Sequence, residues 1–104
     1  MNNDTKNILQ GLGHYELLVL YYLSQTENIV NQRTISKDTG VSPTTLRQKL
    51  DTLIELELIS IIPRGRNNQV VITAKGQDNL ANWEKTTVGK RIIKQLKDIL
   101  EKNK

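Results

Sequence analysis

Apolar residues along this chain gather in short blocks whose spacing predicts a mainly α-helical fold with a small β-hairpin. Residues 14–26 are apolar almost all round, and a run of this length predicts a buried helix rather than a strand. Residues 43–57 repeat apolar positions at helical spacing and predict a further helix. Its apolar stripe is expected to contain Leu46, Leu50, Leu53 and Ile54, with Leu58 closing it.

Between these two segments, the capping residues predict a helix-turn-helix. Asn31 is expected to cap a short helix that runs through Thr39, because its side-chain oxygen can accept from an amide of the first turn. Gly40 can end that helix in the left-handed conformation that glycine adopts at low cost. Ser42 can cap the next helix, with Pro43 at its first position, where the missing N–H costs nothing. Two helices joined by so short a turn are typical of a helix-turn-helix.

A hairpin and further helices are expected in the C-terminal half. Residues 58–62 and 69–73 have the composition of strands, and the segment between them has that of a turn. Thr73 can cap a fourth helix, which the stretch 86–89 can interrupt before a helical stripe resumes to the C-terminus. A short strand is also predicted at 29–30.

Composition limits the classes of function. The 104 residues suffice for one domain, and there is no cysteine, so disulfides and thiolate metal sites are excluded. No apolar run approaches the ~18 residues that a membrane span needs, and residues 1–7 lack the apolar core of a signal peptide. We therefore expect a soluble, cytoplasmic protein with no membrane partner.

The net charge of +4 comes entirely from the C-terminal end of the chain. Residues 1–83 hold eight Lys/Arg and eight Asp/Glu, whereas residues 84–104 hold seven and three. Total charge is therefore a weak argument for nucleic-acid binding, and the argument has to rest on local placement.

The stretches 32–47 and 53–59, followed by 71–76 at the end of the hairpin, occur in a characteristic order. They resemble the winged helix-turn-helix transcriptional regulators, especially the MarR-like and PadR-like groups. In those families, the third stretch leads into a dimerisation helix.

This resemblance covers about residues 14–80 and implies a winged helix-turn-helix domain there. Residues 1–13 are mostly polar and contain Gly11 and Gly13, so they are interpreted as an N-terminal arm or a short packing segment. Residues 81–104 are expected to form a C-terminal dimerisation helix. Such proteins often have a glycine where this chain has Glu57. The third helix is therefore expected to end in a strained or altered geometry.

The first two turns of the third helix are the candidate base-reading surface. Helix-turn-helix proteins contact base edges with these residues, where Arg suits guanine and Gln suits adenine. Asp51 and Glu55 would be repelled by DNA, so only the start of the helix should enter a groove. Together with the second helix and the turn of the hairpin, the candidate DNA-binding residues are Arg33, Lys37, Ser42, Thr44, Thr45, Arg47, Gln48, Arg64, Arg66, Asn67 and Asn68. The alternative is that these polar side chains serve only to solvate the surface.

The C-terminal helix is the candidate dimer interface. Its apolar residues form a stripe for which the predicted domain offers no obvious partner, and such a stripe usually marks an interface. The predicted interface residues are Trp83, Val88, Ile92, Leu96, Ile99 and Leu100. The competing interpretation is that this helix folds back on the first helix of its own chain.

The sequence offers little for catalysis or for a cofactor. His14 is the single histidine and no cysteine can join it, so a zinc site is not expected. No phosphate-binding loop or nucleophile motif occurs. We therefore expect no enzyme activity, no metal and no cofactor.

Three functions remain open at this stage. The leading one is sequence-specific binding of double-stranded DNA by a homodimer, most simply as a transcriptional regulator. The second is a plasmid or viral DNA-segregation (partition) or replication-accessory protein that binds DNA through the same surface. The third is a winged-helix module for protein–protein interaction, with an unknown partner.

Overall fold

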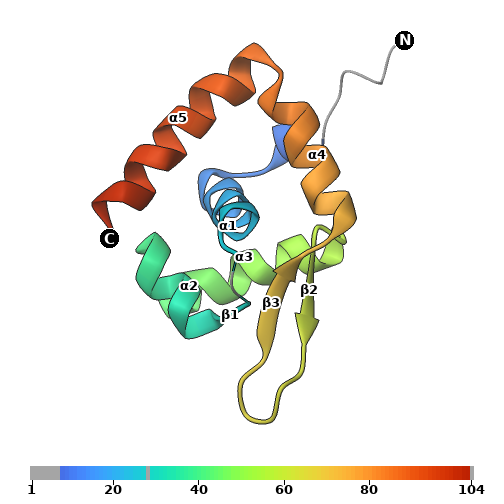
Figure 1. Ribbon diagram of the computed structural model, residues 1–104, viewed down its shortest axis with the longest axis vertical. Coiled ribbons are helices and arrows are strands. Elements are labelled where there is room, and N and C mark those ends of the chain that lie inside the picture. Colours follow the sequence, from blue (N-terminus) through green and yellow to red (C-terminus); the bar gives the residue numbers. More distant parts are fainter. Residues whose placement is uncertain (1–7, 28, 104) are drawn as a thin grey trace.

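The structure, a computed structural model, describes residues 8–27 and 29–103. The elements run in the order η2 (Ile8–Gly11), α1 (His14–Gln25), β1 (Val30–Asn31), α2 (Gln32–Thr39), α3 (Pro43–Glu55), β2 (Ile59–Ile62), β3 (Gln69–Ile72), α4 (Ala74–Glu84) and α5 (Thr87–Lys102) (Figure 1). The mainly helical fold with a small hairpin is as predicted. No helix within the described ranges is both long and apolar enough to cross a bilayer.

The sheet is small, antiparallel and ordered β1-β3-β2. β2 and β3 form the predicted hairpin, with Ile59 opposite Ile72 and Ile62 opposite Gln69. The short β1 adds to the other edge of β3 through the pair Asn31 and Gln69. This pairing places the start of α2 beside the loop of the hairpin.

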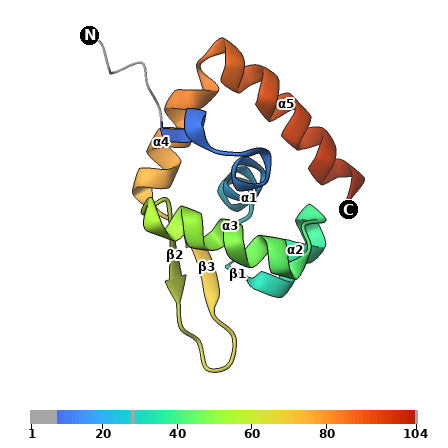
Figure 2. The same cartoon turned by 180° about the vertical axis from the view of Figure 1, so that it is seen from behind.

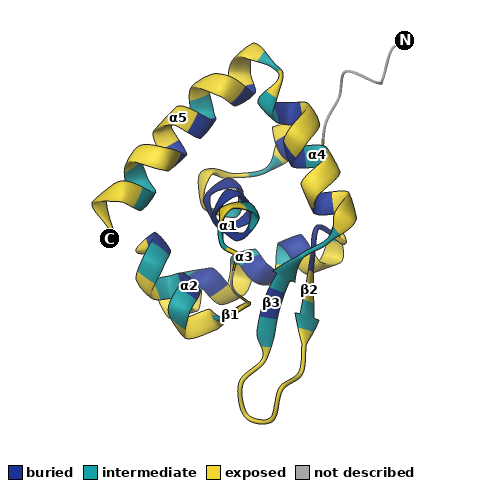
Figure 3. Cartoon of the chain, in the orientation of Figure 1, coloured by how far each residue is buried: buried dark blue, intermediate teal, exposed yellow. Residues whose placement is uncertain are grey.

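Helix α1 occupies the centre of the molecule, with α3, α4, α5 and the sheet arranged around it (Figures 1 and 2). Seven consecutive residues, 17–23, are buried, which explains why this segment is apolar on every face (Figure 3). Neighbouring elements cover the helix from several sides, so an amphipathic pattern would leave polar groups in the core.

Leu46, Leu50 and Leu53 form the buried stripe of α3, as predicted, and α3 packs on α1. Ile54 was expected to share this stripe, but it is 38% exposed because it lies at the edge of the apolar face. The helix ends at Glu55 rather than 57, since Glu57 takes a left-handed φ of 64°. The expected alteration of this helix end is therefore present.

At the N-terminus, residues 1–7 of the predicted arm lie outside the described residues. The short helix η2 lies against α4 and buries Leu9 completely. This part of the predicted arm or packing segment therefore belongs to the core.

Helix α5 folds back over α1, so the expectation that its stripe has no partner within the chain is wrong. Leu96 is 0% exposed and Trp83, at the end of α4, is 1% exposed. Both side chains lie in the core of the single chain, where neither presents a surface to a second copy. A sharp corner between α4 and α5 makes this possible, because Gly89 has no Cβ that would overlap the Trp83 carbonyl oxygen.

Candidate nucleic-acid interface

Local capping fixes the two helices of the helix-turn-helix. Asn31 accepts a hydrogen bond from the Thr34 amide at 2.9 Å and so caps α2, which Gly40 ends at φ 79°. Ser42 accepts from the Thr45 amide at 3.3 Å and caps α3, with Pro43 in the first turn. These caps are as predicted, and they fix where α2 begins and ends and where α3 begins.

A further contact between helices fixes α2 on the core. The Tyr22 hydroxyl of α1 donates to Oδ2 of Asp38 at 2.6 Å. Burial, followed by the hydrogen bond to Asp38 and its negative charge, raises the pKa of Tyr22 well above its ordinary value. The phenol is therefore protonated at neutral pH, and its hydrogen bond to Asp38 ties α2 to α1.

The start of α3 presents polar side chains to solvent. Thr44, Arg47 and Gln48 are exposed and Thr45 is half-buried. Asp51 and Glu55 are exposed farther along the helix, so negative charge lies toward its C-terminal half as expected. The N-terminal half of α3, where the helix dipole is positive, therefore carries no acidic side chain.

Helix α2 contributes two exposed cations one turn apart, Arg33 and Lys37. They line a hollow of about 440 Å³ between α2 and the start of α3, together with Pro43 and Leu46. Positive side chains therefore lie beside the first turn of the candidate reading helix.

The loop between β2 and β3, residues 63–68, which we call the wing, projects from the body of the molecule (Figures 1 and 3). Residues 62–68 are exposed throughout. The Asn67 amide donates to the Arg64 carbonyl at 3.0 Å and closes a turn. Gly65 occupies the first central position of that turn with φ 59°, a conformation that favours glycine. The turn directs Arg64 and Arg66 into solvent.

The wing and α2 converge on one polar hollow of about 340 Å³. It is lined by Arg66, Asn67 and Asn68 from the wing and by Asn31, Gln32 and Arg33 from the start of α2. The pairing of β1 with β3 brings the two parts together. Gln32 was not among the predicted site residues. The signal for it was the short β-strand before α2, which places the first residue of that helix beside the wing.

The cations of this surface form no ion pair with any residue that the structure describes. Over the ranges that the structure describes, the ion pairs join Lys49 to Glu16 at 3.8 Å and Lys75 to Glu57 at 3.5 Å. Neither involves the basic residues of α2, the start of α3 or the wing, namely Arg33, Lys37, Arg47, Arg64 and Arg66. These positive charges are therefore available to a ligand. No group of three metal-ligating side chains occurs in the described part of the chain.

The predicted interface residues, which lie in α4 and α5, divide into two groups. Trp83 and Leu96 are buried in the core, whereas Val88 is 46% exposed and Ile92, Ile99 and Leu100 are partly buried. Val88, Ile92 and Ile99 share one side of α5, which we call the apolar flank.

No family model and no curated protein matches this sequence. Solved structures do match in fold. TubR from Bacillus megaterium pBM400 is 18% identical with a TM-score of 0.67, over 76% of this chain and 93% of that one. A MarR-family transcriptional regulator from Rhodococcus sp. RHA1 is 21% identical with a TM-score of 0.58, over 92% and 61% of the two chains. RV1404 from Mycobacterium tuberculosis is 22% identical with a TM-score of 0.66, over 89% and 61%.

The chain therefore has the winged-helix fold, as the sequence predicts. It spans 61% of the length of the Rhodococcus and Mycobacterium proteins.

Proposed function

We propose that this chain binds double-stranded DNA in a sequence-specific manner as a homodimer and acts as a transcriptional regulator in the cytoplasm. The observation that carries the proposal is that Arg66 of the wing and Arg33 of α2 line one polar hollow, while Arg33 and Lys37 line a second hollow against the first turn of α3, and none of these cations is in an ion pair with a described residue. In this account the chain acts by binding and catalyses no reaction.

Each part of the surface has a separate role in the proposed complex. The first two turns of α3 enter the major groove, where Arg47 and Gln48 contact base edges. The wing lies over the adjacent minor groove or backbone, with Arg64 and Arg66 near phosphates. Arg33 and Lys37 of α2 contact the DNA backbone beside α3.

The apolar flank of α5 supplies the proposed contact between two copies. A two-fold dimer would present two α3 helices about one helical turn, or ~34 Å, apart and favour a palindromic site. The exposure of Val88 supports this role, because burial of an exposed apolar side chain against a second copy is favourable.

Selection from a pool of random duplexes tests sequence specificity. The full chain is expected to enrich a palindromic motif and to bind it more tightly than a shuffled duplex of equal composition. Arg47→Ala or Gln48→Ala should lose about 1–3 kcal/mol of that preference while retaining affinity for shuffled DNA. Failure to enrich any motif, or equal affinity for both duplexes, would contradict sequence-specific reading by α3.

A further inference from the structure

The wing and the start of α2 leave the sheet side by side. Asn31 pairs with Gln69 across the antiparallel strands β1 and β3 (Figure 1). The residues that follow Asn31 and those that precede Gln69 therefore begin next to each other. As a result, Arg33 and Arg66 line the same hollow of about 340 Å³, although they lie far apart in the sequence.

This hollow presents positive charge and hydrogen-bond donors. Beside the two guanidinium groups, it is lined by the amide side chains of Asn31, Gln32, Asn67 and Asn68. Among the lining residues that the structure describes, none is acidic or apolar. The side-chain oxygen of Asn31 already accepts from the Thr34 amide at 2.9 Å, which leaves its NH2 group as a donor. The ligand that such a lining suits is an anion with several acceptor oxygens.

The size of the hollow suits one phosphate group held from two sides. A sphere of that volume is about 9 Å across, which accommodates a phosphate and a guanidinium hydrogen bond of about 2.8 Å on either side. The planar fork of a guanidinium also matches the spacing of phosphate oxygens. Neither Arg33 nor Arg66 is in an ion pair with a described residue, so both charges are available to the anion.

In the proposed complex with DNA, the hollow lies between two grooves of the duplex. Arg33 also lines the hollow against the first turn of α3, the helix that enters the major groove. The wing, on the other side, lies toward the adjacent minor groove. The two grooves of a duplex adjoin along the backbone of one strand, so that strand crosses the hollow. The hollow therefore meets phosphates rather than base edges.

We propose that Arg33 and Arg66 bind one and the same backbone phosphate, so that α2 and the wing hold the DNA strand at a single point. This assignment rests on the proposed DNA binding and goes beyond it, because it makes the two contacts interdependent. Each guanidinium keeps the phosphate where the other can bind it, so loss of either arginine should release the contact. Arg64 does not line the hollow and makes a separate contact.

A double-mutant cycle on the full chain tests the shared phosphate. Arg33→Ala and Arg66→Ala should each weaken duplex binding at least about tenfold. Each should also make the slope of log K against log salt shallower by about 1 per protomer. The variant with both changes should lose no more affinity and no more slope than either single variant. Both side chains are exposed, so thermal unfolding should stay the same in all three variants.

Arg64→Ala/Arg66→Ala is the matched control, because only Arg66 of this pair lines the hollow. Its two losses should add, with a slope shallower by about 2 per protomer. A neutral methylphosphonate, placed at one backbone position at a time in the duplex that the chain binds most tightly, identifies the phosphate. One position per half-site should weaken binding of the unmodified chain and of Arg64→Ala, but not of Arg33→Ala or Arg66→Ala.

The outcomes separate this assignment from the proposed function. Additive losses for Arg33 and Arg66, in a chain that binds duplex DNA, would overturn the shared phosphate and leave the proposed function intact. Two separate methylphosphonate positions, one for each arginine, would overturn it in the same way. A chain that binds no duplex at any salt concentration would contradict the proposed function itself, and the shared phosphate with it.

Discussion

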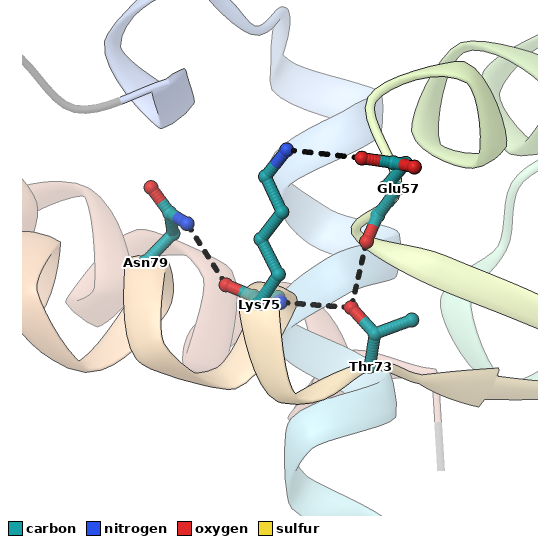
Figure 4. A network of polar contacts seen from close by, with 5 residues as sticks. Glu57, Thr73, Lys75 and Asn79 are labelled. Carbon is teal, nitrogen blue, oxygen red and sulfur yellow. Dashed lines mark hydrogen bonds and ion pairs between the residues drawn. The ribbon is translucent and has the colours of Figure 1, made fainter.

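The hydroxyl of Thr73 donates to the backbone carbonyl of Glu57 at 2.7 Å while its oxygen accepts from the Gly76 amide at 2.9 Å (Figure 4). The first bond ties the end of α3 to the start of α4, and the second caps α4. The side chain of Glu57 also pairs with Lys75 at 3.5 Å. Because β2 and β3 lie between these two points in the chain, this joint holds the base of the wing against α3.

The joint requires a left-handed residue at position 57, where a glycine would be unstrained. The Leu58 amide donates to the Leu53 carbonyl at 3.0 Å and the Glu57 amide to the Ile54 carbonyl at 2.9 Å, the pair of bonds that closes a Schellman motif. Glu57→Gly should therefore raise the free energy of unfolding by about 1 kcal/mol, measured by urea denaturation. The lost ion pair is exposed and contributes little.

Glu57→Ala is the control for this prediction, because it removes the ion pair and keeps the Cβ. Its stability should stay within ~0.5 kcal/mol of the unmodified chain. If both variants are equally stable, the strain at Glu57 does not exist as described.

The corner between α4 and α5 depends on Gly89. An added Cβ would overlap the carbonyl oxygen of Trp83, which also accepts from the Thr86 hydroxyl at 2.7 Å. Gly89→Ala should therefore destabilise the chain by about 1–3 kcal/mol or more, as overpacked sites do. Gly11→Ala is the control, because its Cβ would meet nothing within 4 Å. Thermal unfolding curves that move equally for both variants would contradict a close approach at the corner.

Dimerisation through the apolar flank can be tested without removing α5, whose loss would expose α1. Ile92→Glu places a charge on that flank and should shift the chain toward monomer in sedimentation equilibrium. Val88→Glu, at a more exposed position, should act in the same direction with less risk to the fold. Lys94→Glu, on the opposite side of α5, should not alter the mass. If the Ile92→Glu and Val88→Glu variants have the same mass in solution as the Lys94→Glu variant, the apolar flank is not the interface.

Local chemistry was predictable from the sequence wherever a single residue type determines the geometry. Asn31, Gly40, Ser42 and Thr73 are the caps that the sequence predicts. The departure at Glu57 was also recognisable, because the resemblance marked a position where glycine is usual.

The position of α5 could not be predicted in the same way. Its periodic apolar residues establish that one face is covered, but the sequence alone does not reveal by what. Leu96 therefore resembled an interface residue, although it lies in the core. The element that covers it, α1, is apolar on every side, so the sequence of α1 does not indicate which of its faces α5 contacts. Gln32 was missed for a related reason, since its place beside the wing depends on pairing between β1 and β3.

The salt dependence of DNA binding, compared between the unmodified chain and Arg64→Ala/Arg66→Ala, tests the central claim most directly. If the wing lies against the backbone, the double variant should bind all duplexes more weakly. Its slope of log K against log salt should be shallower by roughly 2 per protomer, about 1 for each lost phosphate contact. Arg91→Ala/Lys102→Ala, with the same loss of charge on α5, should retain both affinity and slope. An unchanged affinity and slope in the wing variant would contradict DNA binding by this surface.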